Sequence, residues 1–143
     1  MADVMEAMKK GKVAEDIPML QILQQDAEQR NVDFNALYQM LSKDIKAGKT
    51  RIMRSGNTLL IYDILQPGVV ELHISTMDSP DKLVKSVTDL FEAMKVAGFK
   101  KGMSVTDNPQ IARVLSAAKI PAKVKQMPST TGVPQYQLTI EVQ

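Results

Sequence analysis

Glu71 and His73 are the two side chains in this sequence best suited to move a proton. They stand two residues apart in a segment, 69–75, where apolar and polar residues alternate. Side chains at positions i and i+2 of a strand share one face of a sheet, so the pair should lie together. A carboxylate beside an imidazole could relay a proton away from an amine. A polar sheet face or a cross-strand salt bridge explains the same residues, and on sequence alone we prefer that interpretation.

The amino-acid composition excludes several other kinds of functional site. The 143 residues contain no cysteine and a single histidine, which excludes disulfides and thiol nucleophiles and argues against a metal site made by protein ligands alone. Eighteen basic and 16 acidic residues leave a net charge of +2, too balanced to indicate a nucleic-acid or membrane partner. No apolar run approaches the roughly 18 residues of a membrane span. The absence of cysteine suits a protein of a host or bacterial cytoplasm, or one assembled in a cytosol.

Helices are predicted in the first third of the chain. Residues 1–10 form a short one, and residues 18–30 form a second with Pro18 at its first position. The third is the clearest, because its apolar residues recur at helical spacing between a capping residue, Asp33, and a terminating glycine, Gly48.

Strands and helices then alternate. Three strands separated by short turns predict an antiparallel meander, and the elements after it are a helix from Pro80 to Gly98, a strand, a second helix and a closing hairpin. The expected strands are 50–54, 58–65, 69–75, 99–106, 122–127 and 135–142. The step from 69–75 to 99–106 should pair in parallel. We therefore expect one α/β (α+β) domain over 1–143, with a helical arm at 1–30 and a mixed-sheet core at 31–143.

One motif accompanies this order of elements. Asn108 opens the helix before the hairpin, and apolar Ile111 and Leu115 follow three and seven residues later. Together, the order and the motif resemble the GNAT superfamily of acyl-CoA-dependent N-acetyltransferases over roughly residues 33–142. The resemblance implies a general base near Glu71. At the position of Leu115 the family usually has a tyrosine that protonates the leaving thiolate, and leucine has no proton to give.

The loop before the long helix departs from the family pattern. In GNAT enzymes, glycines there let the backbone approach the pyrophosphate of CoA at a helix N-terminus. This chain has Asp78, Ser79, Pro80 and Asp81 instead, with no glycine, one amide fewer at the proline and two negative charges that should repel a phosphate. The loop should still start a helix well, since Ser79 can cap it and Pro80 suits its first position. We therefore predict no cofactor site here.

Other surfaces have two interpretations each. Val4, Met5 and Met8 could form a docking arm for a partner protein, or could pack on the same domain. Basic residues gather between positions 43 and 54 and at Lys123 and Lys125, but without a nucleic-acid motif we expect a solvated surface and no specific nucleic-acid ligand. The loop 128–134 is interpreted as a hairpin connection rather than a recognition loop.

These features predict a non-catalytic structural or assembly protein with a degenerate GNAT-like fold. Small domains of this type resemble virion and internal proteins of tailed phages, so the expected partners are other protein chains in a virion or a homo-oligomer. The alternative is a divergent acetyl-CoA-dependent N-acetyltransferase that uses Glu71 as base on a small amine or peptide. A third interpretation is a regulatory domain that binds a small ligand in a vestigial cleft.

Overall fold

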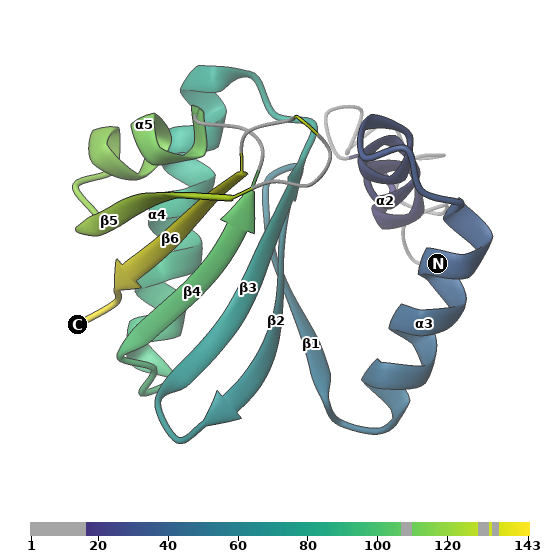
Figure 1. The fold of residues 1–143 in the computed structure, drawn as a ribbon, viewed down its shortest axis with the longest axis horizontal. Helices are drawn as coiled ribbons and strands as arrows, with labels where there is room; N and C mark the ends of the chain where they lie inside the picture. The colour runs from purple at the N-terminus through teal and green to yellow at the C-terminus, as the bar shows by residue number, and fades with distance from the viewer. Residues whose placement is uncertain (1–16, 107–109, 129–131, 133–134) are drawn as a thin grey trace, which may run out of the picture.

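A six-stranded sheet with helices on both of its faces forms the framework of the protein (Figure 1). The computed structural model describes residues 17–106, 110–128, 132 and 135–143. In chain order its elements are α2 (Met19–Gln29), α3 (Phe34–Lys46), β1 (Thr50–Ser55), β2 (Thr58–Gln66), β3 (Val69–Thr76), α4 (Pro80–Val96), β4 (Lys101–Thr106), α5 (Gln110–Ala117), β5 (Ala122–Met127) and β6 (Gln135–Glu141). The predicted helix 1–10, the docking candidates Val4, Met5 and Met8, and the helix-opening Asn108 lie outside the described residues.

Local signals in the sequence set the helix ends. The Asp33 side chain accepts a hydrogen bond of 3.0 Å from the backbone nitrogen of Ala36 and caps α3. Pro80 is the first residue of α4, as predicted. Pro18 is the N-cap of α2 rather than its first residue, because its backbone stays extended (ψ 140°) while its carbonyl accepts the first helical bonds.

The sheet order is β1-β2-β3-β4-β6-β5. The first three strands form the predicted antiparallel meander, and β4 pairs in parallel with β3 after the crossover through α4. The closing hairpin folds back so that its second strand, β6, lies between β4 and β5. The predicted α/β fold with a mixed sheet is confirmed.

Each face of the sheet carries its own apolar cluster. On the α4–α5 face, twelve buried residues form the main core, among them Leu60, Leu90 and Leu115. On the other face, Ile22, Leu23 and Leu41 from α2 and α3 pack on Leu59 of β2. Burying one such side chain is worth about 1.5–3 kcal/mol, so the second cluster helps to hold α2 and α3 against the meander.

The pairing between β3 and β4 is short. Only Val69, Val70 and Glu71 have partners on β4, at residues 101–103. Beyond these pairs the two strands separate toward their carboxyl ends (Figure 1). We call these two stretches without mutual pairing, residues 72–76 of β3 and 104–106 of β4, the wedge. It interrupts the sheet directly below the start of α4.

Candidate functional site

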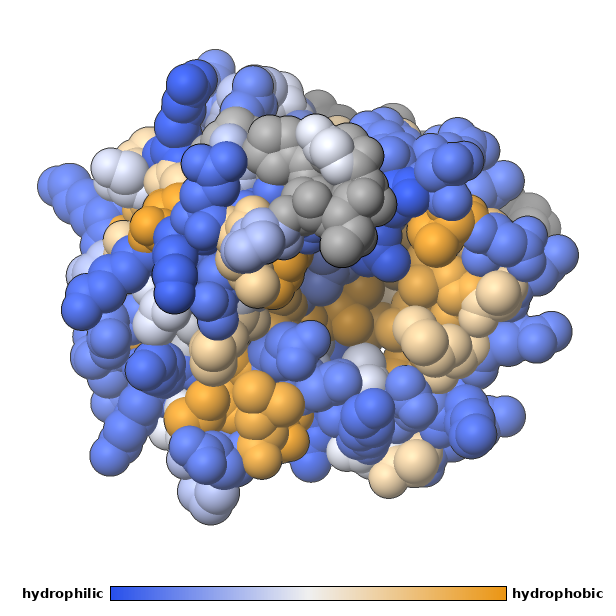
Figure 2. All heavy atoms as spheres, viewed as in Figure 1, coloured by the Kyte–Doolittle hydropathy of each residue, from blue (hydrophilic) through white to orange (hydrophobic). Residues whose placement is uncertain are grey.

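A pocket of about 160 Å³ lies between α2, α3 and the meander. We call it the α2–α3 pocket. Its lining combines apolar residues with carboxylates: Leu23, Asp26, Arg30, Leu37, Met40, Leu41, Asp44, Thr50, Ile61, Asp63, Glu71, Leu72 and His73. Figure 2 shows a hollow with an apolar floor on this side of the molecule, bordered by apolar residues on the right and by hydrophilic residues below.

Both side chains singled out from the sequence line this pocket. Glu71 is exposed and stands opposite Asp63 of β2, whereas His73 stands opposite Ile61 and its side chain is one-third exposed. Glu71 is the last residue of β3 that pairs with β4, and His73 lies two residues into the unpaired stretch. The predicted shared face therefore exists, and it borders the wedge.

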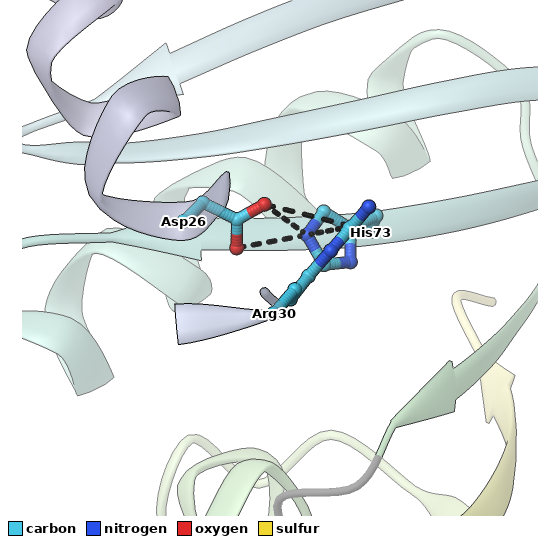
Figure 3. A network of polar contacts seen from close by, with 3 residues as sticks. All are labelled: Asp26, Arg30 and His73. Carbon is cyan, nitrogen blue, oxygen red and sulfur yellow. Dashed lines mark hydrogen bonds and ion pairs between the residues drawn. The ribbon is translucent and has the colours of Figure 1, made fainter. Parts of the chain in front are cut away.

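The structure adds two residues from α2 that the sequence did not reveal (Figure 3). Nε2 of His73 lies 3.1 Å from each carboxylate oxygen of Asp26, and Nη1 of Arg30 lies 3.1 Å from the same Nε2. Arg30 also forms an ion pair of 3.5 Å with Asp26, one helical turn away. The i,i+4 spacing of Asp26 and Arg30 is visible in the sequence. Their contact with a strand residue more than 40 positions away is not.

The loop before α4 is organised around Asp78. Its carboxylate accepts hydrogen bonds from the backbone nitrogen of Asn57, from the hydroxyl of Thr58 at 2.7 Å and from the hydroxyl of Ser86 at 2.9 Å. These donors belong to the β1–β2 turn and to the buried side of α4. The charge of Asp78 is therefore engaged by donors, instead of lying free beside the helix N-terminus as the sequence interpretation assumed.

The start of α4 differs from the expectation in a second way. Ser79 occupies the N-cap position, but its side chain makes no capping hydrogen bond. Pro80 and Asp81 follow it in the first turn and are exposed. The Ser79 side chain therefore caps none of the first amides of the helix, whereas the amide of Leu83 donates to the carbonyl of Ser79.

Other predicted positions have structural roles. Leu115 is completely buried in the main core, so it packs against the sheet and offers no polar group. Arg54, from the basic stretch, donates hydrogen bonds to the carbonyls of Gly56 and Ile17 and so ties the β1–β2 turn to the start of α2. None of the helices in the described part of the chain is long and apolar enough to cross a membrane.

Comparison with known proteins gives structural neighbours only. No family profile matches this sequence, and no curated protein sequence matches it either. A Desulfovibrio desulfuricans protein described as a GNAT-family acetyltransferase superimposes with a TM-score of 0.60 at 10% identity, covering 89% of this chain and 95% of its own.

Two further neighbours were solved with cofactor. The yncA protein of Salmonella typhimurium, described as an acetyltransferase and bound to acetyl-CoA, matches with a TM-score of 0.56 and 11% identity over 78% of this chain and 75% of its own. The spermidine N-acetyltransferase of Vibrio cholerae, in complex with CoA and spermine, matches with a TM-score of 0.54 and 10% identity over 76% and 74%.

These neighbours contradict the prediction of a non-catalytic phage assembly protein. The three neighbours named above are all described as acetyltransferases, and two of these three hold CoA or acetyl-CoA. They lend no support to a virion role, nor to the expectation that the fold lacks a cofactor. The error arose because a missing glycine motif was taken as a missing function. At identities near 10% the likeness establishes architecture, and the chain has the fold of the GNAT acetyltransferases.

Proposed function

We propose that this protein is an acetyl-CoA-dependent N-acetyltransferase that acts on a small amine. The observation that carries the proposal is the position of the α2–α3 pocket beside the wedge. Glu71, the last paired residue of β3, and His73, the second unpaired one, line the pocket at the point where β3 and β4 separate. An acyl donor in the wedge and an amine in the pocket would meet at these two side chains.

The wedge fits the arm of an acyl-CoA. Beyond Glu71, β3 has no ladder partner on β4, and an extended ligand with amides can pair with the edge of such a strand. The arm of CoA is such a ligand, with two amides between its pyrophosphate and its sulfur. When bound, its thioester supplies the acetyl group.

The start of α4 fits the phosphate end less completely. Because α4 begins four residues after β3 ends, its first amides lie at the open end of the wedge. Pro80 cannot donate, but the macrodipole of α4 favours an anion at its N-terminus, and two positively charged residues, Lys82 and Lys85, follow within two turns. The hydrogen bonds that Asp78 accepts offset part of the repulsion from its charge, and the charge of the exposed Asp81 remains.

The α2–α3 pocket suits a small amine. Its volume of about 160 Å³ lies below the roughly 300–1,000 Å³ of sites for drug-sized ligands, so we expect a small molecule or a single side chain. Carboxylates at Asp44, Asp63 and Glu71 outnumber the one arginine in the lining and favour a cationic guest. Glu71 or His73 would accept the proton that the amine must lose before it can attack.

Calorimetric titration of acetyl-CoA and CoA into the purified protein tests the proposal. We expect a dissociation constant below about 100 µM, equivalent to about −5.5 kcal/mol. In amide NMR spectra, the largest shifts should fall on residues 72–76, 104–106 and the first turn of α4. Lys85→Ala should weaken binding about two- to fivefold, whereas Lys125→Ala on the distant edge strand β5 should leave it unchanged.

Pantetheine and ADP separate the two halves of the cofactor. Pantetheine alone should perturb the wedge residues, and ADP should perturb only the start of α4. If acetyl-CoA does not bind at millimolar concentration, or shifts only residues far from the wedge, the proposed activity is wrong.

A further inference from the structure

The contacts around His73 identify which ring nitrogen carries the proton. The guanidinium of Arg30 can only donate a hydrogen bond and the carboxylate of Asp26 can only accept one, yet both lie within 3.1 Å of Nε2. A neutral imidazole nitrogen either donates or accepts, so Nε2 can serve only one of these partners. The histidine tautomer must be assigned from this network.

The geometry favours donation to Asp26. Both carboxylate oxygens lie 3.1 Å from Nε2, and an acceptor nitrogen would direct its lone pair at two negative oxygens. Asp26 is also the better-buried partner, with a side chain 12% exposed against 39% for Arg30. A hydrogen bond to an ionised carboxylate in a partly buried site is the stronger of the two possible bonds. Arg30 then balances the charge of Asp26 through their ion pair.

The second ring nitrogen consequently holds the lone pair. No described residue forms a hydrogen bond with Nδ1, and the ring, one-third exposed, lines the α2–α3 pocket. Figure 3 shows the ring with one edge toward Asp26, which leaves its opposite edge away from the carboxylate. A proton acceptor of fixed orientation therefore borders the wedge.

We propose that Asp26 is a positioning residue that holds His73 with its proton on Nε2, so that Nδ1 accepts the proton of the acceptor amine. This inference rests on the proposed acetyltransferase function. As the amine nitrogen forms its bond to the acyl carbon, the acyl–sulfur bond breaks and the amine proton passes to Nδ1. Asp26 stabilises the imidazolium that results, and Nδ1 then passes this proton to the thiolate formed by the cleavage, which leaves as thiol. Asp26 and His73 come from different elements, α2 and β3, so docking of the helix assembles the pair.

The single histidine makes the test direct. In protein labelled with ¹⁵N-histidine at a pH of about 9, where imidazole is neutral, long-range proton–nitrogen spectra identify the protonated nitrogen without overlap. We expect an Nε2–H signal that is protected from solvent exchange. In Asp26→Ala its exchange should accelerate at least about tenfold, and Asp26→Asn, which keeps an acceptor oxygen without the charge, should lie between the two.

Arg30→Ala distinguishes the two assignments. If Asp26 is the partner, the Nε2–H signal survives in Arg30→Ala. If Arg30 instead donates to Nε2, the wild-type ring carries its proton on Nδ1, and that result overturns the proposal. Equal exchange in wild type and Asp26→Ala overturns it as well. Amide spectra of each variant establish that it is folded, and Asp44→Ala, on the same pocket wall, should leave the histidine signals unchanged.

Kinetics separate this inference from the proposed function. Asp26→Asn should lower kcat about tenfold to a hundredfold and leave the KM for acetyl-CoA unchanged, since general base catalysis contributes roughly 10²–10⁴-fold in all. If acetyl-CoA fails to bind while the Nε2–H pattern is present, the proposed function falls and with it the role of Nδ1. If acetyl transfer occurs and Asp26→Asn is as fast as wild type, only the role of Asp26 is overturned.

Discussion

Replacing Asp78 with asparagine should destabilise the protein far more than the same change three residues later at Asp81. Asp78 accepts hydrogen bonds from three donors. Two of these donors are the hydroxyls of buried residues, Thr58 (0% exposed) and Ser86 (5% exposed). Asp81 is exposed in the first turn of α4. Both variants remove one negative charge near the start of α4. They differ in the hydrogen bonds that the replaced carboxylate accepts.

The magnitude follows from the donors. An asparagine at 78 keeps one acceptor oxygen, and at the position of Oδ2 this oxygen can still serve the backbone N–H of Asn57 and the hydroxyls of Thr58 and Ser86. The three retained bonds lose their charge assistance, about 1 kcal/mol each. Thr58 keeps its second bond, of 2.7 Å, to Thr76. We expect a loss of about 3 kcal/mol, equivalent to a Tm lower by about 9 °C for a domain of this size.

Urea denaturation followed by circular dichroism, together with thermal scans, measures both variants. For Asp81→Asn we expect a loss of at most about 1 kcal/mol, the value of a carboxylate at a helix N-terminus. Equal losses in the two variants would refute the reasoning, because they would show that the bonds made by Asp78 contribute no more than a surface charge. An Asp78→Asn protein with wild-type stability would refute it more strongly.

Three further substitutions test the packing and the caps. Gly102→Ala would place its Cβ 2.6 Å from Cδ2 of buried Leu72. We expect urea denaturation to show a free energy of unfolding lower by about 1–3 kcal/mol. Wild-type stability would mean that Leu72 has room to move. In the same assay, Leu115→Ala should lower the free energy of unfolding by about 2–5 kcal/mol. The control Leu65→Ala, at an exposed position, should lower it by about 0.5 kcal/mol or less. Similar losses in the two variants would exclude a core role for Leu115. Asp33→Ala should cost about 1 kcal/mol and Asp33→Ser should recover most of it, unless the cap is irrelevant to α3.

The residues around His73 illustrate why the site was only half predictable. Alternation along β3 places Glu71 and His73 on one face, and this could be predicted because strand periodicity is a property of neighbouring residues. Asp26 reaches His73 only because Ile22 and Leu23 bury themselves on Leu59 and so dock α2 over β3. Because the hydrophobic effect is non-directional, an apolar pattern does not specify where on the sheet a helix docks. The residue spacing in the sequence therefore does not predict which strand residue a polar side chain on that helix will contact.

The loop before α4 misled the functional prediction for the same reason. Its composition, with no glycine and two aspartates, was taken to exclude a phosphate. Which way the Asp78 carboxylate points depends on the β1–β2 turn, where a Cβ on Gly56 would lie 2.8 Å from the Ser86 hydroxyl and 3.1 Å from Asp78. Only the folded chain brings these three segments together.

The sequence by itself determined the elements of this protein, because caps, turn residues and periodicity act within a few positions of the chain. It also determined the parallel step from β3 to β4, through the handedness of crossover connections. The tertiary structure decided that this pairing ends after Glu71, that the α2–α3 pocket lies beside the resulting wedge, and that Asp26 meets His73 there. These features depend on the distances between neighbouring strands and between the sheet and the helices packed on it. All the side chains packed between those elements set these distances together.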